Sequence, residues 1–235
     1  MNEGSNSDGG RLLEAAAVAA LGGVFGFAAG SPFGLAGPLS AVAALNGAVS
    51  GWRRIYDFGC SNGLVAFTLD STWAAPMTLA SLGSHVLGML RGRPGYDPSL
   101  STRQNRHVYR WGFVPRRGFA ITIGNVVSGA GDTSLARRRR LVTDHENVHV
   151  WQARWFGPLY PLLYGGWMLA GGMVGAAVWV VRRRSASLAR MVETWGYYLN
   201  PFEWWAYSRD GHWPPSGKVA GTGWRRPMVR PLRRP

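Results

Sequence analysis

Long stretches without a charged side chain constrain this sequence most. They cover residues 15–52, 71–90 and 155–181. Apolar stretches of this length must be buried in a protein core or in a membrane. The first stretch is rich in Ala and Gly and is interrupted at Ser31 and Pro32, which predicts two helices joined there. Small residues let two helices approach closely, both in soluble Ala-rich hairpins and in membranes.

The length of 235 residues fits one domain with tails. Residues 1–10 are polar and Gly-rich, and residues 214–235 are rich in Pro, Gly and Arg, so we predict a disordered lead and a basic disordered tail. Between them we expect a single membrane-associated domain over residues 11–213. Within it, residues 11–51 form the Gly/Ala-rich helical hairpin, and residues 107–213 form the core that carries the chemistry.

The third uncharged stretch, residues 155–181, ends directly at Arg182–Arg184. Its length, its aromatic edge and its basic end are typical of a transmembrane helix, whereas its glycines and prolines also fit a buried hairpin of a soluble core. The formal net charge of +14, from 26 basic and 12 acidic residues, favours an anionic partner such as a membrane surface. No nucleic-acid-binding motif accompanies this charge, so we expect no specific nucleic-acid partner.

Strand signals are confined to two regions. Residues 107–114 and 119–128 flank a turn at 115–118, which predicts a β-hairpin, and residues 52–70 suggest a second, shorter strand pair. Residues 71–90 read as a core helix. The predicted fold class is therefore α+β and mainly helical, with a small β-hairpin sheet beside Gly/Ala-rich apolar helices.

The residues that carry chemistry are His145, Glu146 and His149, which form the pattern H-E-x-x-H. On a helix, positions i and i+4 lie on one face, so both imidazoles can reach one zinc ion while Glu146 lies beside the water bound to it. The chain has a single cysteine, Cys60, so any metal must be held by His or carboxylate. A second interpretation is structural: Thr143 and Glu146 are spaced as a capping box, and the two histidines could share a helix face by accident.

The pattern resembles the gluzincin branch of zinc metallopeptidases, in which H-E-x-x-H is completed by a glutamate from a second, downstream helix. Glu203, followed by Ala206, is similar to the Glu-x-x-Ala signature of that second helix, and residues 145–167 are similar to a stretch in small bacterial gluzincin-like proteins. The resemblance covers roughly residues 107–213. It implies a zincin-like active-site helix in a protein of the bacterial inner membrane.

The same resemblance implies the roles of the site residues. His145, His149 and Glu203 would hold Zn²⁺, and Glu146 would be the catalytic general base that acts on a peptide or protein substrate. Tyr207 and His212 are candidates for stabilising the transition state, as are Tyr197 and Tyr198.

Other assignments of these residues stay open. Asn200 and Pro201 form a good helix start with Glu203 at its third position, which needs no metal. Rivals for the third ligand are Asp210, His212 and Glu193. Candidates for orienting the imidazoles are Asp144, Asn147 and Gln152.

A single membrane crossing between His149 and Glu203 would put the two halves of the site on opposite sides. We therefore expect the chain to turn back at Gly165–Gly166 or at Gly171–Gly172, as a re-entrant or interfacial hairpin. The rival function is a noncatalytic Gly-rich membrane scaffold or metal-binding protein. The sequence sets neither the substrate nor the oligomeric state.

Overall fold

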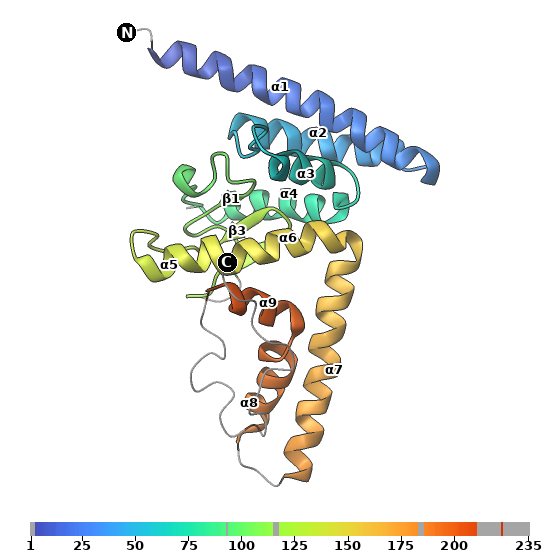
Figure 1. The fold of residues 1–235 in the computed structure, drawn as a ribbon, viewed down its shortest axis with the longest axis vertical. Helices are drawn as coiled ribbons and strands as arrows, with labels where there is room; N and C mark the ends of the chain where they lie inside the picture. Colours follow the sequence, from blue (N-terminus) through green and yellow to red (C-terminus); the bar gives the residue numbers. More distant parts are fainter. Residues whose placement is uncertain (1–2, 93, 115–117, 183–185, 211–221, 223–235) are drawn as a thin grey trace.

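The computed structural model describes residues 3–92, 94–114, 118–182, 186–210 and 222 (Figure 1). It is 71% helical with one small three-stranded sheet, so the predicted α+β, mainly helical fold is confirmed. Apart from Thr222, the tail predicted over residues 214–235 lies outside the described residues.

The chain begins with a helical hairpin of α1 (Glu3–Gly30) and α2 (Ala36–Trp52), joined by a short 3-10 turn at Ser31–Phe33, where the break was predicted. The two backbones lie in close contact: a Cβ atom added to Gly26 would lie 2.5 Å from the carbonyl oxygen of Leu39. Residues 3–10, part of the segment predicted as a disordered lead, form the start of α1 in the structure.

Helices α3 (Ser61–Ser71) and α4 (Ala75–Leu90) follow. The strand pair predicted over residues 52–70 is therefore wrong. Its Ser-Asn-Gly sequence is the first turn of α3, and the residues buried along α3 recur at helical spacing: Gly63, Ala66, Phe67 and Asp70. The core helix predicted over residues 71–90 is present as α4.

The sheet holds β1 (His107–Val108), β2 (Ile121–Ile123) and β3 (Val126–Ser128) in the order β1-β3-β2. β2 and β3 are antiparallel, whereas β1 is parallel to β3. The hairpin predicted between residues 107–114 and 119–128 is thus wrong in its pairing. The hairpin forms within the second segment, around Gly124–Asn125, where Gly124 has a φ of +56°. Gly-Asn is a common hairpin turn pair, and this signal was overlooked.

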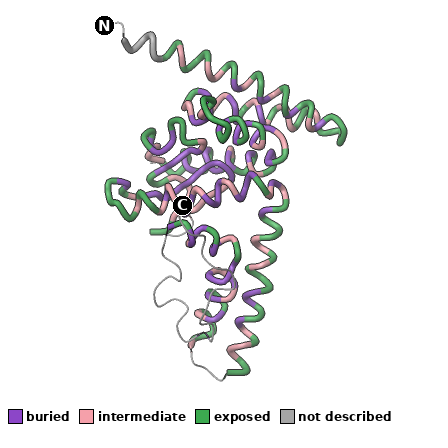
Figure 2. Tube along the Cα trace, in the orientation of Figure 1, coloured by how far each residue is buried: buried purple, intermediate pink, exposed green. Residues whose placement is uncertain are grey.

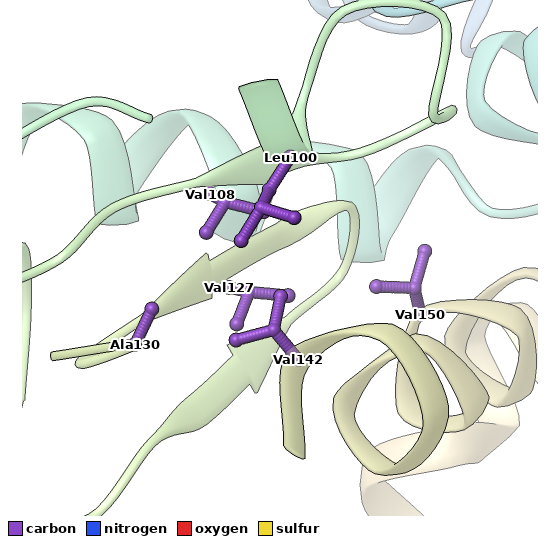
Figure 3. Packing of buried hydrophobic residues seen from close by; sticks show 6 residues of the cluster. All are labelled: Leu100, Val108, Val127, Ala130, Val142 and Val150. Atoms are coloured by element: carbon purple, nitrogen blue, oxygen red, sulfur yellow. The ribbon is translucent and has the colours of Figure 1, made fainter. Parts of the chain in front are cut away.

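A long helix crosses the sheet. It comprises α5 (Ala136–Arg140), a π-helical turn η3 (Leu141–Glu146) and α6 (Asn147–Phe156). Apolar side chains from the strands, the loops and this helix form the core between them, as Figure 3 shows: Leu100, Val108, Val127, Ala130, Val142 and Val150. This packing fixes the helix that carries the H-E-x-x-H residues.

At Gly157, which has a φ of +50°, the chain turns sharply into α7 (Tyr160–Val181). α7 is one continuous helix, so the turns predicted at Gly165–Gly166 and Gly171–Gly172 are wrong. The chain reverses after Val181 instead, and α8 (Leu188–Glu193) and the π-helical turn η5 (Thr194–Tyr198) return along α7. Gly171 serves this packing, since an added Cβ atom would lie 2.4 Å from the carbonyl oxygen of Trp195.

The last described helix, α9 (Pro201–Asp210), brings the chain back beneath α6. The hairpin of α7 with α8 and η5 therefore leaves the core and returns to it. Helices α6 and α9, which precede and follow this hairpin in the sequence, therefore contact each other although α7 itself contains no turn.

Within the described part of the chain, two helices are long and apolar enough to cross a membrane, Asp8–Phe33 and Ala136–Val181, although core helices of soluble proteins and signal sequences can pass the same test. In each, only 17% of the most apolar window is buried inside the protein. Figure 2 shows the resulting exposure along α1 and α7. The sharp turn at Gly157 divides the second helix, so its straight apolar part is α7.

Candidate metal centre

The π-helical turn η3 ends with His145 and Glu146, and His149 follows in the first turn of α6. The helix is continuous through these positions, so the two imidazoles lie on one face, as predicted. Both histidine side chains are buried. The capping-box interpretation is wrong because the helix already begins at Ala136, and Thr143 donates its hydroxyl hydrogen bond to Asp144.

Helix α9 supplies Glu203. Asn200 caps this helix, since its Oδ1 accepts a hydrogen bond of 3.0 Å from the backbone N–H of Phe202, and Pro201 occupies the first position. The predicted helix start is therefore confirmed. The same helix start also directs Glu203 toward the two histidines. Glu203 can therefore be both part of a well-formed helix start and a metal ligand.

Three side chains meet at one point. The Nε2 atoms of His145 and His149 are 3.3 Å apart. Oε2 of Glu203 lies 3.5 Å from Nε2 of His145, and Oε1 lies 3.4 Å from Nε2 of His149. Oε2 is buried and has no hydrogen-bond partner among the described residues. His145, His149 and Glu203 thus form a buried group that could hold a metal ion.

Side-chain oxygen atoms also lie close to Nδ1 of each of the two imidazoles. Nδ1 of His149 is 2.8 Å from Oε1 of Gln152, whose amide donates to the carbonyl oxygen of Phe202 on α9. Nδ1 of His145 lies 3.5 Å from a carboxylate oxygen of Asp210. A hydrogen on each Nδ1 atom leaves each Nε2 lone pair directed at the centre, which is the arrangement of metal-binding histidines.

The charges of the group reinforce one another. Burial opposes the charged form of His145, but the neighbouring carboxylates of Asp210, Glu203 and Glu146 outweigh it and raise its pKa to about 10. Burial also opposes the charged form of His149, but Glu203 outweighs it and raises the pKa of His149. Burial would raise the pKa of Glu203, but the two histidines hold it well below its usual range. The apo centre therefore keeps protons on its imidazoles, and a metal ion must displace them.

Glu146 is buried beside the edge strand β2. The Thr122 hydroxyl donates a hydrogen bond of 2.7 Å to Oε2 of Glu146. Strand and helix together therefore fix this carboxylate.

Two tyrosines from the start of α7 complete the site, and the sequence analysis missed them. The Tyr164 hydroxyl donates a hydrogen bond of 2.6 Å to Oε1 of Glu203. The Tyr160 hydroxyl lies 3.3 Å from both Nδ1 of His149 and Oε1 of Gln152. Their i, i+4 spacing directly after the motif helix was the available signal.

The other predicted tyrosines lie nearby. The ring of Tyr207 packs against His145 with centroids 4.5 Å apart. Burial and the charge of Glu203 raise the pKa of Tyr207 and of Tyr197. Tyr198 stacks edge-on against Tyr197.

The remaining candidates are placed elsewhere. Glu193 is exposed on α8, outside the metal-binding group. Asn147 accepts a hydrogen bond from Arg106, and Asp144 accepts one from Thr143, so Gln152 is the predicted orienting residue that contacts an imidazole. His212 lies outside the described residues.

In comparisons with known proteins, no family model, no curated protein sequence and no solved structure matches this chain.

Proposed function

We propose that the chain is a zinc-dependent metallopeptidase of the gluzincin type, associated with the bacterial inner membrane. One observation carries the proposal, namely that His145, His149 and Glu203 are buried together with one ligand atom of each within 4.8 Å of the others. The two Nε2 atoms are 3.3 Å apart, and each lies 3.4–3.5 Å from a different carboxylate oxygen of Glu203.

The 3.3 Å separation of the two Nε2 atoms suits zinc. Zinc bonds to imidazole nitrogen and carboxylate oxygen are about 2.0–2.1 Å long, so tetrahedral geometry places neighbouring ligand atoms about 3.3–3.4 Å apart. Two nitrogens and one carboxylate are also a common catalytic donor set, which leaves the fourth position open to water. The orphaned Oε2 of Glu203 and the oriented imidazoles support the same assignment.

When bound, zinc supplies a Lewis acid and lowers the pKa of a coordinated water to about 7. The residues around the zinc site would transfer the proton and bind the substrate. Glu146 accepts a proton from the attacking water and passes it to the nitrogen of the broken peptide bond. Thr122 occupies Oε2 of Glu146, so Oε1 is the atom that carries the proton.

Charge that develops on the substrate carbonyl oxygen needs a donor nearby. Tyr207 packs against His145, and the Tyr164 hydroxyl is bonded to Glu203. We assign transition-state stabilisation to this aromatic group, with His212 as a further candidate.

An extended peptide substrate can pair with strand β2. It is the edge strand of the sheet, and its Thr122 holds the proposed general base. Pairing along β2 would bring the peptide backbone beside Glu146 through main-chain hydrogen bonds.

Membrane association is supported by α7. Its exposed residues are apolar along the whole helix, and Arg182 follows its last residue directly. Exposed arginines in α5, within the run 137–140, add attraction of about 1 kcal/mol each to an anionic membrane surface. We propose that the α7–α8 hairpin lies in the membrane interface, which keeps His149 and Glu203 on one side.

The test is Glu146→Gln in the full-length protein, purified in detergent and loaded with zinc. We expect this variant to keep about one zinc per chain and to lose hydrolysis of an internally quenched peptide library. His149→Ala should lose the zinc, whereas Glu193→Gln, a matched change at an exposed glutamate, should keep both properties. If Glu146→Gln stayed active, the assigned base would be wrong. Zinc binding without hydrolysis by the unaltered chain would favour the noncatalytic metal-binding alternative.

A further inference from the structure

We propose that helices α1–α4 form a lipid-embedded bundle, whose outer faces contact hydrocarbon and whose interior holds polar side chains. The inference rests on the membrane association proposed above and extends it to the first hundred residues. It does not depend on the metal centre.

The interior between these helices holds many polar side chains beside a small apolar cluster of Val18, Ile55, Tyr56, Ala66 and Phe67. The buried side chains of α2, α3 and α4 include Asn46, Ser50, Asp70, Ser71, Thr78, Ser81, Ser84 and His85. Several are joined by hydrogen bonds: the Asn46 amide donates to the Tyr56 hydroxyl, which donates to Asp70, at 2.9 Å each. A helical bundle in water places mainly Leu, Ile and Val at such positions.

The exterior of α2, α3 and α4 is mainly apolar and uncharged, whereas the charged residues of α1, Asp8, Arg11 and Glu14, lie in its first half. On α2 and α4 there is no Asp, Glu, Lys or Arg at all, and the one such residue of α3, Asp70, is buried. The large exposed side chains include Leu45, Leu64, Leu79, Val86, Leu87, Met89 and Leu90. This distribution is the reverse of that of a water-soluble bundle.

Contacts between α1 and α2 support the same environment. Gly22 and Gly26 of α1 face the backbone of α2, and Gly47 and Gly51 of α2 face that of α1. Each pair is spaced i, i+4. Small residues at this spacing bring helices together by backbone contact, as is common where lipid surrounds the helices.

The ends of the helices match a bilayer. With 17 and 16 residues, α2 and α4 are each about 25 Å long, which covers most of a hydrocarbon core of about 30 Å. α2 ends at the exposed Trp52, followed by Arg53 and Arg54, and Arg91 follows α4 directly. Aromatic and basic residues at these ends suit the membrane–water interface and its anionic headgroups.

One ion pair ties this bundle to the helix of the metal centre. Asp70 of α3 accepts two hydrogen bonds from Arg154 of α6, at 2.9 and 2.8 Å, and both side chains are buried. Ionisable residues inside a lipid-embedded bundle pair with one another in this way. In Figure 1, α2 and α4 run across the view, whereas α7 runs down it. A bilayer that α2 and α4 cross would therefore have α7 lying along its surface, as proposed for the interfacial hairpin.

The test compares two leucines of equal exposure in the full-length chain. Leu79 on α4 is 56% exposed, and Leu135, which precedes the arginines of α5, is 57% exposed. In a Cys60→Ser background, Leu79→Cys and Leu135→Cys are spin-labelled and placed in phosphatidylethanolamine–phosphatidylglycerol vesicles. We expect the label at residue 79 to relax with oxygen and to be shielded from a soluble nickel chelate, and the label at residue 135 to show the opposite.

Two outcomes would overturn the inference. Nickel access at residue 79 would place α4 in water, and exclusion of both reagents there would mean that another protein surface covers it. As a second measurement, Leu79→Lys should lower the yield of membrane-inserted protein at least tenfold, with Leu135→Lys unchanged; equal yields would also contradict it. If an alkaline carbonate wash released the unaltered chain from membranes, the bundle would not be embedded in lipid, although the interfacial association proposed for α7 would still stand. A failure of metal binding or hydrolysis would leave the spin-label results unaffected.

Discussion

Replacing Asp70 by asparagine should strongly destabilise the fold, because it removes one charge of a buried ion pair. Asp70 is 2% exposed and Arg154 1% exposed. The carboxylate accepts two hydrogen bonds from Arg154, and further ones from Tyr56 at 2.9 Å and Asn125 at 3.2 Å. In Asp70→Asn the guanidinium stays buried without a counter-charge, and its Nη2 keeps only the carbonyl oxygen of Asn105.

Breaking a buried pair from one side costs about 3–5 kcal/mol. That is a large part of a typical unfolding free energy of about 5–15 kcal/mol. The measurement is urea unfolding in detergent, followed by tryptophan fluorescence. The exposed pair between Asp8 and Arg11 provides the control, since Asp8→Asn should stay within about 0.5 kcal/mol of the unaltered protein.

A double variant separates the charge from packing. Asp70→Asn combined with Arg154→Met leaves no unpaired charge, so it should recover at least half of the loss. If Asp70→Asn lay within about 1 kcal/mol of the unaltered protein, the assigned cost of the unpaired guanidinium would be refuted.

Three other predictions concern the hairpin and the metal centre. Gly171→Ala should destabilise the protein, by about 1–3 kcal/mol, because its new methyl group would collide with the backbone of η5. Gly165→Ala, whose methyl group would meet nothing within 4 Å, should stabilise it by up to about 1 kcal/mol, and equal effects in urea unfolding would argue against the packing described for α7. Gln152→Leu should weaken zinc binding about 10–100-fold in a chelator competition, because it removes the oxygen that orients His149; unchanged affinity would show that the orientation has no role. Because the pKa of His145 is raised to about 10, zinc binding at pH 7.5 should release at least one proton and tighten as the pH rises. Calorimetry in buffers of different ionisation enthalpy would detect this release, and heats independent of the buffer would contradict it.

Local patterns in the sequence predicted part of this architecture. The i, i+4 spacing of His145 and His149 and the helix start before Glu203 are local features, and the fold brings them together as expected. The break at Ser31 is local as well. The pairing of β1 with β3 and the return of the chain after α7 depend on contacts between distant segments, which a single sequence does not contain.

The first hundred residues illustrate a second limit. Hydropathy averages over a helix, so the polar side chains inside α4, such as Ser81 and His85, dilute the signal from exposed Leu79 and Leu87. Only the structure separates the inner face from the outer one. In the same way, Tyr164 appeared to belong to an apolar stretch until the fold placed its hydroxyl on Glu203.

The central claim is one zinc ion held by His145, His149 and Glu203, and X-ray absorption at the zinc edge on the full-length protein tests it most directly. We predict four-coordinate zinc with two imidazoles and oxygen ligands at about 2.0–2.1 Å, and no zinc signal from purified His149→Ala. Zinc surrounded by water alone, or an identical spectrum in His149→Ala, would contradict it.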